Sequence, residues 1–301
     1  MKRPDLLSCC MMALVGAMWG LHGPAIKFAF AAGFTFPQLV LGEYLVGAFV
    51  FGSVVLIQGR RPPTDRRFWT IMLAAGVIGC GVPLFLFWAY QLGPVPVGAT
   101  LLFLYVPFTQ LFNYALTRKP PSPRELVSAA LVIGGAVIAA DFLGSANAAN
   151  LRGAPFAVIA ALCFAGFFVL TSRLGYDGTP ALRSLICCLV SCTIVLPLSF
   201  IAGWTLVPAV ASFSLAAIWI VSLGVLGQVI PVFLLVHFGP KTGSGLGSIL
   251  TATELPVAVT VSALLLGDSF GPSRIIGVAL VLFGIALPHL PRRTPVAASG
   301  T

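Results

Sequence analysis

The octapeptide Gly-Val-Ile-Gly-Cys-Gly-Val-Pro at residues 76–83 recurs as Gly-Val-Leu-Gly-Gln-Val-Ile-Pro at residues 224–231. In both copies, a glycine precedes the proline by four residues. Leu92-Gly93-Pro94 then matches Phe238-Gly239-Pro240. Further pairs separated by 149 residues are Pro107 with Pro256, Pro123 with Pro272, and Gly135 with Gly284. The pattern predicts that the chain consists of two copies of one structural unit.

The composition indicates the environment of these two units. The 301 residues are 58% hydrophobic and only 8% charged, with a mean hydropathy of +1.04, whereas soluble domains carry about 25% charged residues. The net charge of +9 does not indicate nucleic-acid binding, because the basic residues are scattered over short loops. We therefore expect an integral protein of the lipid bilayer that crosses it many times.

Ten apolar segments are separated by glycine- and proline-containing turns. A chain in lipid must satisfy its backbone hydrogen bonds internally, and these segments are too long and too uniformly apolar for barrel strands. The fold class is therefore predicted to be all-α, with ten transmembrane helices at about residues 6–32, 36–57, 68–90, 95–116, 125–143, 154–171, 181–201, 215–236, 244–266 and 275–290.

Lysine and arginine predict the orientation of these helices. If the N-terminus is cytoplasmic, the outer loops contain only Arg152 and Arg274, and Lys27 lies within the membrane. All other Lys and Arg residues then lie on the inner side, as the positive-inside rule requires. Both termini are therefore expected in the cytoplasm, in a plasma membrane such as the bacterial inner membrane.

Each predicted repeat contains five helices, residues 6–143 in the first and 153–290 in the second, followed by a short cytoplasmic tail at 291–301. Because five is odd, the second copy must enter the membrane from the opposite side. Inverted repeats of this kind (5+5) are typical of secondary transporters, whose solute site lies near the bilayer midplane between the halves.

Several local features resemble the EamA-type permeases of the drug/metabolite transporter superfamily. They are Trp19-Gly20 followed by Ala25-Ile26-Lys27, Pro107 in the fourth segment, and the end of the ninth segment, Leu264-Leu265-Leu266-Gly267-Asp268. The resemblance covers about residues 8 to 290. Two positions differ: His22 lies where many relatives carry asparagine, and Glu43 where many carry arginine.

The resemblance implies a secondary transporter, not an enzyme, that exports small metabolites, amino acids or drug-like compounds by alternating access around a central cavity. We favour amino-acid efflux, either coupled to protons or facilitated, with no cofactor. One alternative is uptake or exchange of a phosphorylated or nucleotide-like metabolite, and another is a non-transporting membrane scaffold. The chain is expected to act as a monomer or homodimer.

The stretch from Trp19 to Lys27 contains unusual residues for a membrane helix. Lys27 and Glu43 lie at similar distances from the turn near Thr35, so adjacent antiparallel helices would bring them level. The pair is interpreted either as a buried ion pair that locks the hairpin or as a gate on the outer side. Gly20, Gly23 and Pro24 are predicted to let the first helix bend, and Pro83 and Pro231 to do so in the third and eighth.

Candidate solute contacts are polar or aromatic residues predicted at membrane depth. His22 is either a packing residue or a solute contact. Glu254 either belongs to a packed face, or it is a coupling carboxylate that titrates near the working pH in a flexible or partly opened helix beside a solute site. The full set of candidates is Trp19, His22, Trp88, Tyr105, Gln228 and Glu254. No metal site is expected, because the seven cysteines lack metal-ligand spacing and the histidines do not cluster.

Overall fold

The computed structural model describes residues 6–59, 62–139, 151–171, 178–208, 213–242, 244–267 and 271–290. This part of the chain is helical and contains no strand. Its α-helices are α1 (Leu6–Ala31), α2 (Phe36–Gln58), α3 (Arg66–Leu92), α4 (Val95–Leu102), α5 (Tyr105–Thr117), α6 (Pro123–Ala139), α7 (Ala154–Thr171), α8 (Pro180–Ile201), α9 (Phe213–Leu223), α10 (Ile230–Thr242), α11 (Ser244–Thr251), α12 (Glu254–Leu266) and α13 (Pro272–Ala286). A π-helix, η3 (Gly224–Val229), joins α9 to α10, and a 3-10 turn, η4 (Leu287–His289), follows α13.

Eight helical stretches of the described residues are long and apolar enough to cross a membrane. The predicted all-α membrane class is thereby confirmed. The fifth and tenth expected segments coincide with α6, of 17 residues, and α13, of 15 residues, which are shorter than the other eight. The predicted end of the first repeat at residues 140–143 and the tail at 291–301 lie outside the described residues.

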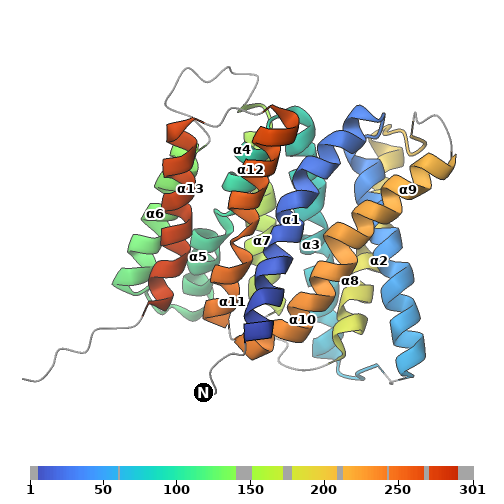
Figure 1. Cartoon of the computed structure of the whole chain (residues 1–301). Helices are drawn as coiled ribbons and strands as arrows, with labels where there is room; N and C mark the ends of the chain where they lie inside the picture. The colour runs from blue at the N-terminus through green and yellow to red at the C-terminus, as the bar shows by residue number, and fades with distance from the viewer. Residues whose placement is uncertain are drawn as a thin grey trace, which may run out of the picture.

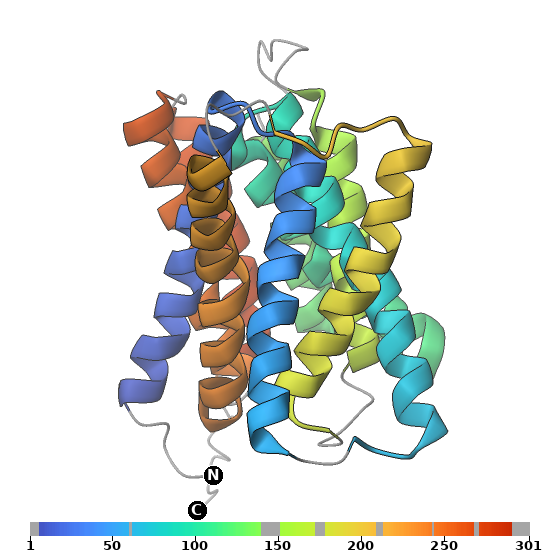
Figure 2. The ribbon, with the colours of Figure 1, turned by 90° about the vertical axis from the view of Figure 1, so that its right-hand side faces the viewer.

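The helices form one bundle of closely packed rods (Figures 1 and 2). α6 and α13 lie side by side at one edge, and α2, α8 and α9 lie at the opposite edge (Figure 1). α3 packs on α7 and α8, and the continuous helix α9–η3–α10 packs on α1 and α2. The third helix of each repeat, α3 in the first and α9–η3–α10 in the second, thus packs between the first two helices of the other repeat.

Glycines at matching positions make both of these contacts close. A Cβ atom at Gly76 in α3 would lie 2.8 Å from the Cβ of Val190 in α8. A Cβ atom at Gly224 in η3 would lie 2.8 Å from the Cβ of Val46 in α2. The repeated glycines seen in the sequence are therefore points of close contact between the two repeats.

The fourth and ninth predicted helices are each broken in two. The sequence predicts the fourth as a single helix, so its break is a correction, whereas a partly opened ninth helix is one of the two interpretations given above. One break lies at Phe103-Leu104 and the other at Ala252-Thr253. Each break covers the two positions that lie four and three residues before a proline, Pro107 in the first case and Pro256 in the second. Because proline has no N–H, the carbonyls of Phe103 and Ala252 lose their α-helical donors. They instead accept from Val106 and Leu255, three residues later, at 3.0 and 3.2 Å.

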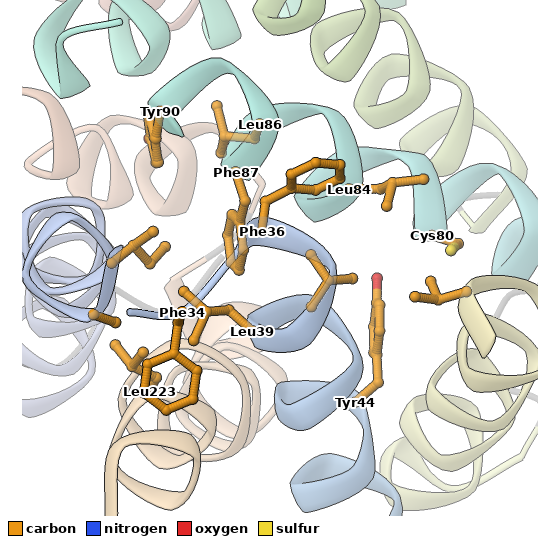
Figure 3. Packing of buried hydrophobic residues seen from close by; sticks show 14 of the residues in the cluster. Phe34, Phe36, Leu39, Tyr44, Cys80, Leu84, Leu86, Phe87, Tyr90 and Leu223 are labelled. Carbon is orange, nitrogen blue, oxygen red and sulfur yellow. The ribbon is translucent and has the colours of Figure 1, made fainter. Parts of the chain in front are cut away.

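A large buried apolar cluster fills the centre between the two repeats (Figure 3). It combines residues of α1 to α4 with residues of α7, α8 and α9. Tyr44 of α2 points its hydroxyl toward α3 (Figure 3), where it lies 3.5 Å from the carbonyl of Gly79. Burial of this cluster joins the two repeats and fixes the positions of α1 and α2, which carry most of the polar residues considered below.

The α6–α13 pair depends on small residues on both helices. A Cβ atom at Gly277 would lie 2.6 Å from the carbonyl oxygen of Gly135 and would also meet the backbone of Ala139. Gly277→Leu is therefore expected to lower the free energy of unfolding by about 1–3 kcal/mol, because a side chain there must push the helices apart. Thermal unfolding of the purified protein in detergent measures this change.

The matched control is Gly134→Ala on the outer face of α6. No atom lies within 4 Å of a Cβ added at Gly134, so this variant is expected to unfold at or slightly above the wild-type temperature. Equal stability of Gly277→Leu and the wild type would contradict the close contact between α6 and α13.

Candidate functional site

Two residues of the first helix contact the π-helix of the second repeat. Trp19 and His22 lie on one face of α1, because residues three apart on a helix are neighbours. The indole Nε1 of Trp19 donates a hydrogen bond to the backbone carbonyl of Gly227, at 2.9 Å. The imidazole of His22 lies directly on Gly227, so a Cβ atom added there would overlap the ring.

Proline explains why the Gly227 carbonyl accepts a side-chain donor. Pro231 follows Gly227 by four residues and has no N–H, so this carbonyl lacks its usual α-helical partner. In a membrane, a carbonyl freed in this way must find a donor within the protein. Trp19 provides that donor from the other repeat.

The carboxylate of Glu43 in α2 is held by His22 in α1. His22 Nε2 and Glu43 Oε1 are 2.8 Å apart, and the two residues are only 9% and 6% exposed. The ring of Phe87 in α3 meets His22 edge-on, with 5.6 Å between ring centroids. The site therefore contains a buried hydrogen-bonded acid–imidazole pair.

This pairing differs from the predicted one, in which Lys27 is the partner of Glu43. Lys27 is half-buried and has its own contacts. Depth along the helices was estimated from residue counts, but counts do not fix which face of α1 meets α2. At 100° per residue, Lys27 points about 140° away from His22, which takes the face toward Glu43.

Glu254 begins α12, directly after the break in the ninth helix. Its backbone carbonyl lies against α1, 2.6 Å from the place where a Cβ atom of Gly20 would be. The carboxylate is close enough to interact electrostatically with His22. It also interacts with the phenols of Tyr90 and Tyr105. Glu254 is half-buried, so its side chain retains some accessible surface.

Tyr105 occupies the matching place in the first repeat, 149 residues before Glu254 and at the start of α5. Its ring packs against Phe164 and Phe168 of α7, with ring centroids 4.8 and 5.5 Å away. The residue after each helix break thus has different neighbours: Glu254 lies against α1, and Tyr105 packs on α7.

The remaining candidates lie elsewhere. Trp88 stacks between Phe36 and Phe156, with centroid distances of 5.0 and 4.2 Å, in an aromatic cluster that also contains Trp204. Gln228 donates to the sulfur of Cys188, at 3.6 Å. Within the described residues, no hydrogen bond, ion pair or ring contact joins either side chain to the His22–Glu43 pair, and both remain proposed solute contacts.

The residues predicted to allow bending have different surroundings. α1 is a continuous helix through Gly20, Gly23 and Pro24. A Cβ atom at Gly23 would lie 2.7 Å from Val95, so this glycine allows close packing in the present conformation. α3 continues through Pro83 as an α-helix, whereas Pro231 adjoins the π-helix. Bending during transport stays a prediction for all of these positions.

Sequence reasoning missed two residues that complete the site, Gly227 and Phe87, and considered Tyr90 only as one of the aromatic residues of the third and fourth helices. Gly227 belongs to the repeated octapeptide, and its spacing from Pro231 indicates a carbonyl without a donor. Phe87 carried no comparable signal among the many aromatic residues of the third helix.

The arrangement combines two carboxylates, one imidazole and two phenols, which suits the exchange of protons and the binding of polar groups. Among the described residues, no group of three or more His, Cys, Asp or Glu side chains could hold a metal ion.

Comparison with known proteins now identifies the family. The model of the EamA-like transporter family matches residues 6–140 and again residues 151–288. The chain belongs to the EamA-like transporter family. The two matches also confirm the resemblance recognised from the sequence and the two-repeat architecture. No curated protein matches the sequence.

One solved structure, described as a crystal structure of a protein, is similar to this EamA-like transporter with a TM-score of 0.62. The two are 18% identical, and the similarity covers 94% of this chain and 95% of that chain. At this identity, the likeness supports the fold alone.

Proposed function

We propose that this EamA-like transporter is a secondary transporter that exports small metabolites, such as amino acids or drug-like compounds. It would act by alternating access around a centre formed by α1, α2, η3 and the two helix breaks. The observation that carries the proposal is the pair of breaks at repeat-related positions, directly before Tyr105 and Glu254. Broken helices at a repeat interface commonly provide the substrate sites of secondary transporters.

The proposal includes an inverted arrangement of five helices in each repeat, with both termini in the cytoplasm of a cell with an inner membrane. The distribution of lysine and arginine supports this orientation. The reciprocal packing of α3 on α7 and α8, and of α9–η3–α10 on α1 and α2, supports a two-fold relation between the repeats. Rocking of one repeat against the other would then expose the centre to each side in turn.

Counterflow in reconstituted liposomes tests this function. Vesicles loaded with one unlabelled solute are diluted into the same solute carrying a label, for a panel of amino acids, amines, sugars and phosphorylated metabolites, with and without a pH gradient. Saturable accumulation of at least one class is expected with the wild type, and also with Gly134→Ala as a folded control. Absence of counterflow for every class with correctly folded protein would favour a scaffold.

A further inference from the structure

The segment that follows α8 lies across the end of the bundle at which α2 begins (Figure 2). This end is named the outer end here, after the proposed orientation. The N–H of Gly203 donates to the carbonyl of Phe200 at 3.3 Å, and Gly203 has a φ of +68°, which glycine adopts without strain. The N–H of Trp204 donates to the carbonyl of Ser199 at 2.8 Å, which completes a Schellman turn. The turn ends α8 and directs the chain back toward α2.

The side-chain amide of Gln38 joins this segment to α2. Its Nε2 donates to the carbonyl oxygens of Thr205 and Val207, at 2.8 and 3.1 Å. Its Oε1 accepts from the backbone N–H of Thr35, at 2.9 Å, and so stabilises the first turn of α2. The residue is only 5% exposed. One buried amide therefore has two separate uses, because its oxygen serves its own helix and its N–H group holds the other repeat.

Four aromatic rings also join the repeats at this end. Phe36 stacks on Trp88 and meets Trp204 edge-on, with 5.0 and 4.9 Å between ring centroids. Trp88 stacks in turn on Phe156, at 4.2 Å. Phe36 and Trp88 belong to the first repeat, whereas Phe156 and Trp204 belong to the second. Such ring pairs stabilise a contact beyond the area that they bury.

These contacts lie above the acid–imidazole pair along one face of α2. Phe36, Leu39 and Glu43 share that face, because residues three or four apart on a helix are neighbours. Glu43 is bonded to His22, so the face points to the centre of the bundle. Leu39 lies between the other two, is 1% exposed and belongs to the central apolar cluster. A molecule that moves along this face from the outer end meets Phe36 before it meets Glu43.

The repeat-related helix α8 does not carry a counterpart of Gln38. Both helices begin directly after a threonine, Thr35 for α2 and Thr179 for α8. The third residue of α2 is Gln38, whereas the third residue of α8 is Leu182. A leucine side chain has no N–H to donate. This difference between two related helix starts adds a contact at the outer end alone, and it favours the state in which that end is closed.

We propose that the N–H group of Gln38 is a latch between the repeats, which holds the outer end closed and must break before a solute can leave there. The latch consists of the two hydrogen bonds from Gln38 to Thr205 and Val207. The inference rests on the proposed transport function and adds what controls access to its centre from one side. Loss of two hydrogen bonds of ordinary strength should shift such an equilibrium about tenfold or more.

A cysteine beneath the latch tests this proposal. Leu39→Cys is made in the full chain, and a membrane-impermeant charged maleimide is added to right-side-out and to inside-out membrane vesicles. Mass spectrometry of the peptide that contains residue 39 separates its labelling from that of the native cysteines. Labelling from the outer side is expected to be slow. Adding Gln38→Glu should raise its rate at least about tenfold, because a carboxylate can still accept from Thr35 but has no N–H to donate.

Gln91→Glu is the matched control for charge. Gln91 is the residue before the end of α3, and its Oε1 accepts from the backbone N–H of Phe36 at 3.0 Å. A glutamate there keeps this acceptor and adds the same charge at the same end, so labelling should stay as in the protein with Leu39→Cys alone. Gln38→Met removes the latch without adding charge and should raise labelling as Gln38→Glu does. Ala29→Cys, at a position that is 0% exposed, provides a second reporter.

Three results would overturn the proposal: unchanged labelling in both Gln38 variants, an equal increase in Gln91→Glu, or fast outer-side labelling while Gln38 is intact. None of these measurements needs a known solute, so they are independent of counterflow. Faster labelling without any counterflow would support the latch and contradict transport. Counterflow with unchanged labelling would establish transport and refute the latch. An increase seen only from the cytoplasmic side would support the latch and contradict the proposed orientation.

Discussion

Gly227→Ala is expected to reduce transport at least about tenfold and to destabilise the protein by about 1–3 kcal/mol. The added Cβ atom would overlap the imidazole of His22, and it would lie 2.8 Å even from the ring carbon Cδ2. The ring has little freedom to move, because Nε2, the ring atom nearest to the added Cβ, is also held by Glu43. One methyl group must therefore displace η3 from α1 or break the acid–imidazole pair. Counterflow and thermal unfolding measure the two effects.

Gly52→Ala is the matched control in the neighbouring helix α2. The nearest atom to a Cβ added at Gly52 is a methyl carbon of Leu185 at 3.6 Å, which is an ordinary van der Waals contact. This variant should keep wild-type transport and stability. If Gly227→Ala behaves in the same way, the close contact between α1 and η3 is not required for either property.

The second large effect concerns the His22–Glu43 pair. Glu43→Leu and His22→Leu are each expected to lower the free energy of unfolding by about 3–5 kcal/mol, because each leaves a buried polar partner alone. The double variant should lose less than the sum of the two single losses, with a coupling of about 0.5–3 kcal/mol. Thermal unfolding of the four proteins completes the cycle.

Lys27 provides the control for this cycle. The sequence predicts that replacing Lys27 rescues a change at Glu43, whereas the structure assigns that role to His22. Adding Lys27→Met to Glu43→Leu should therefore give nearly additive losses. Rescue by Lys27→Met, with no coupling between His22 and Glu43, would restore the original prediction.

Much of the fold follows from the sequence because the bilayer restricts the choice of structure. Long apolar runs must be helical there, and repeated glycines and prolines mark two related units. The helix breaks were also present in the sequence as Pro107 and Pro256, since each removes a backbone donor. The prediction of a single fourth helix failed because it located Pro107 without following the carbonyl that this proline leaves free.

The site was less accessible to prediction, since it depends on how each helix is rotated. Residue counts gave Lys27 and Glu43 similar depths, but the rotation of α1 brings His22 to Glu43. Packing sets this rotation through small residues such as Gly20 and Gly227, whose partners lie in the other repeat. Such contacts join residues more than 200 positions apart, so they cannot be predicted from local sequence patterns.

The contact between Trp19 and Gly227 bears on how the two halves diverged. Trp19 of the first repeat is equivalent to Phe167 of the second, and Gly227 of the second repeat is equivalent to Gly79 of the first. In both cases the equivalent positions are 148 residues apart. Phe167 also packs on Gly79, within 2.9 Å of the place of a Cβ atom, but phenylalanine has no N–H to donate. A dimer built from two copies of the second half would therefore leave a carbonyl without its indole donor. The duplicated units have become specialised partners, and the chain needs one of each.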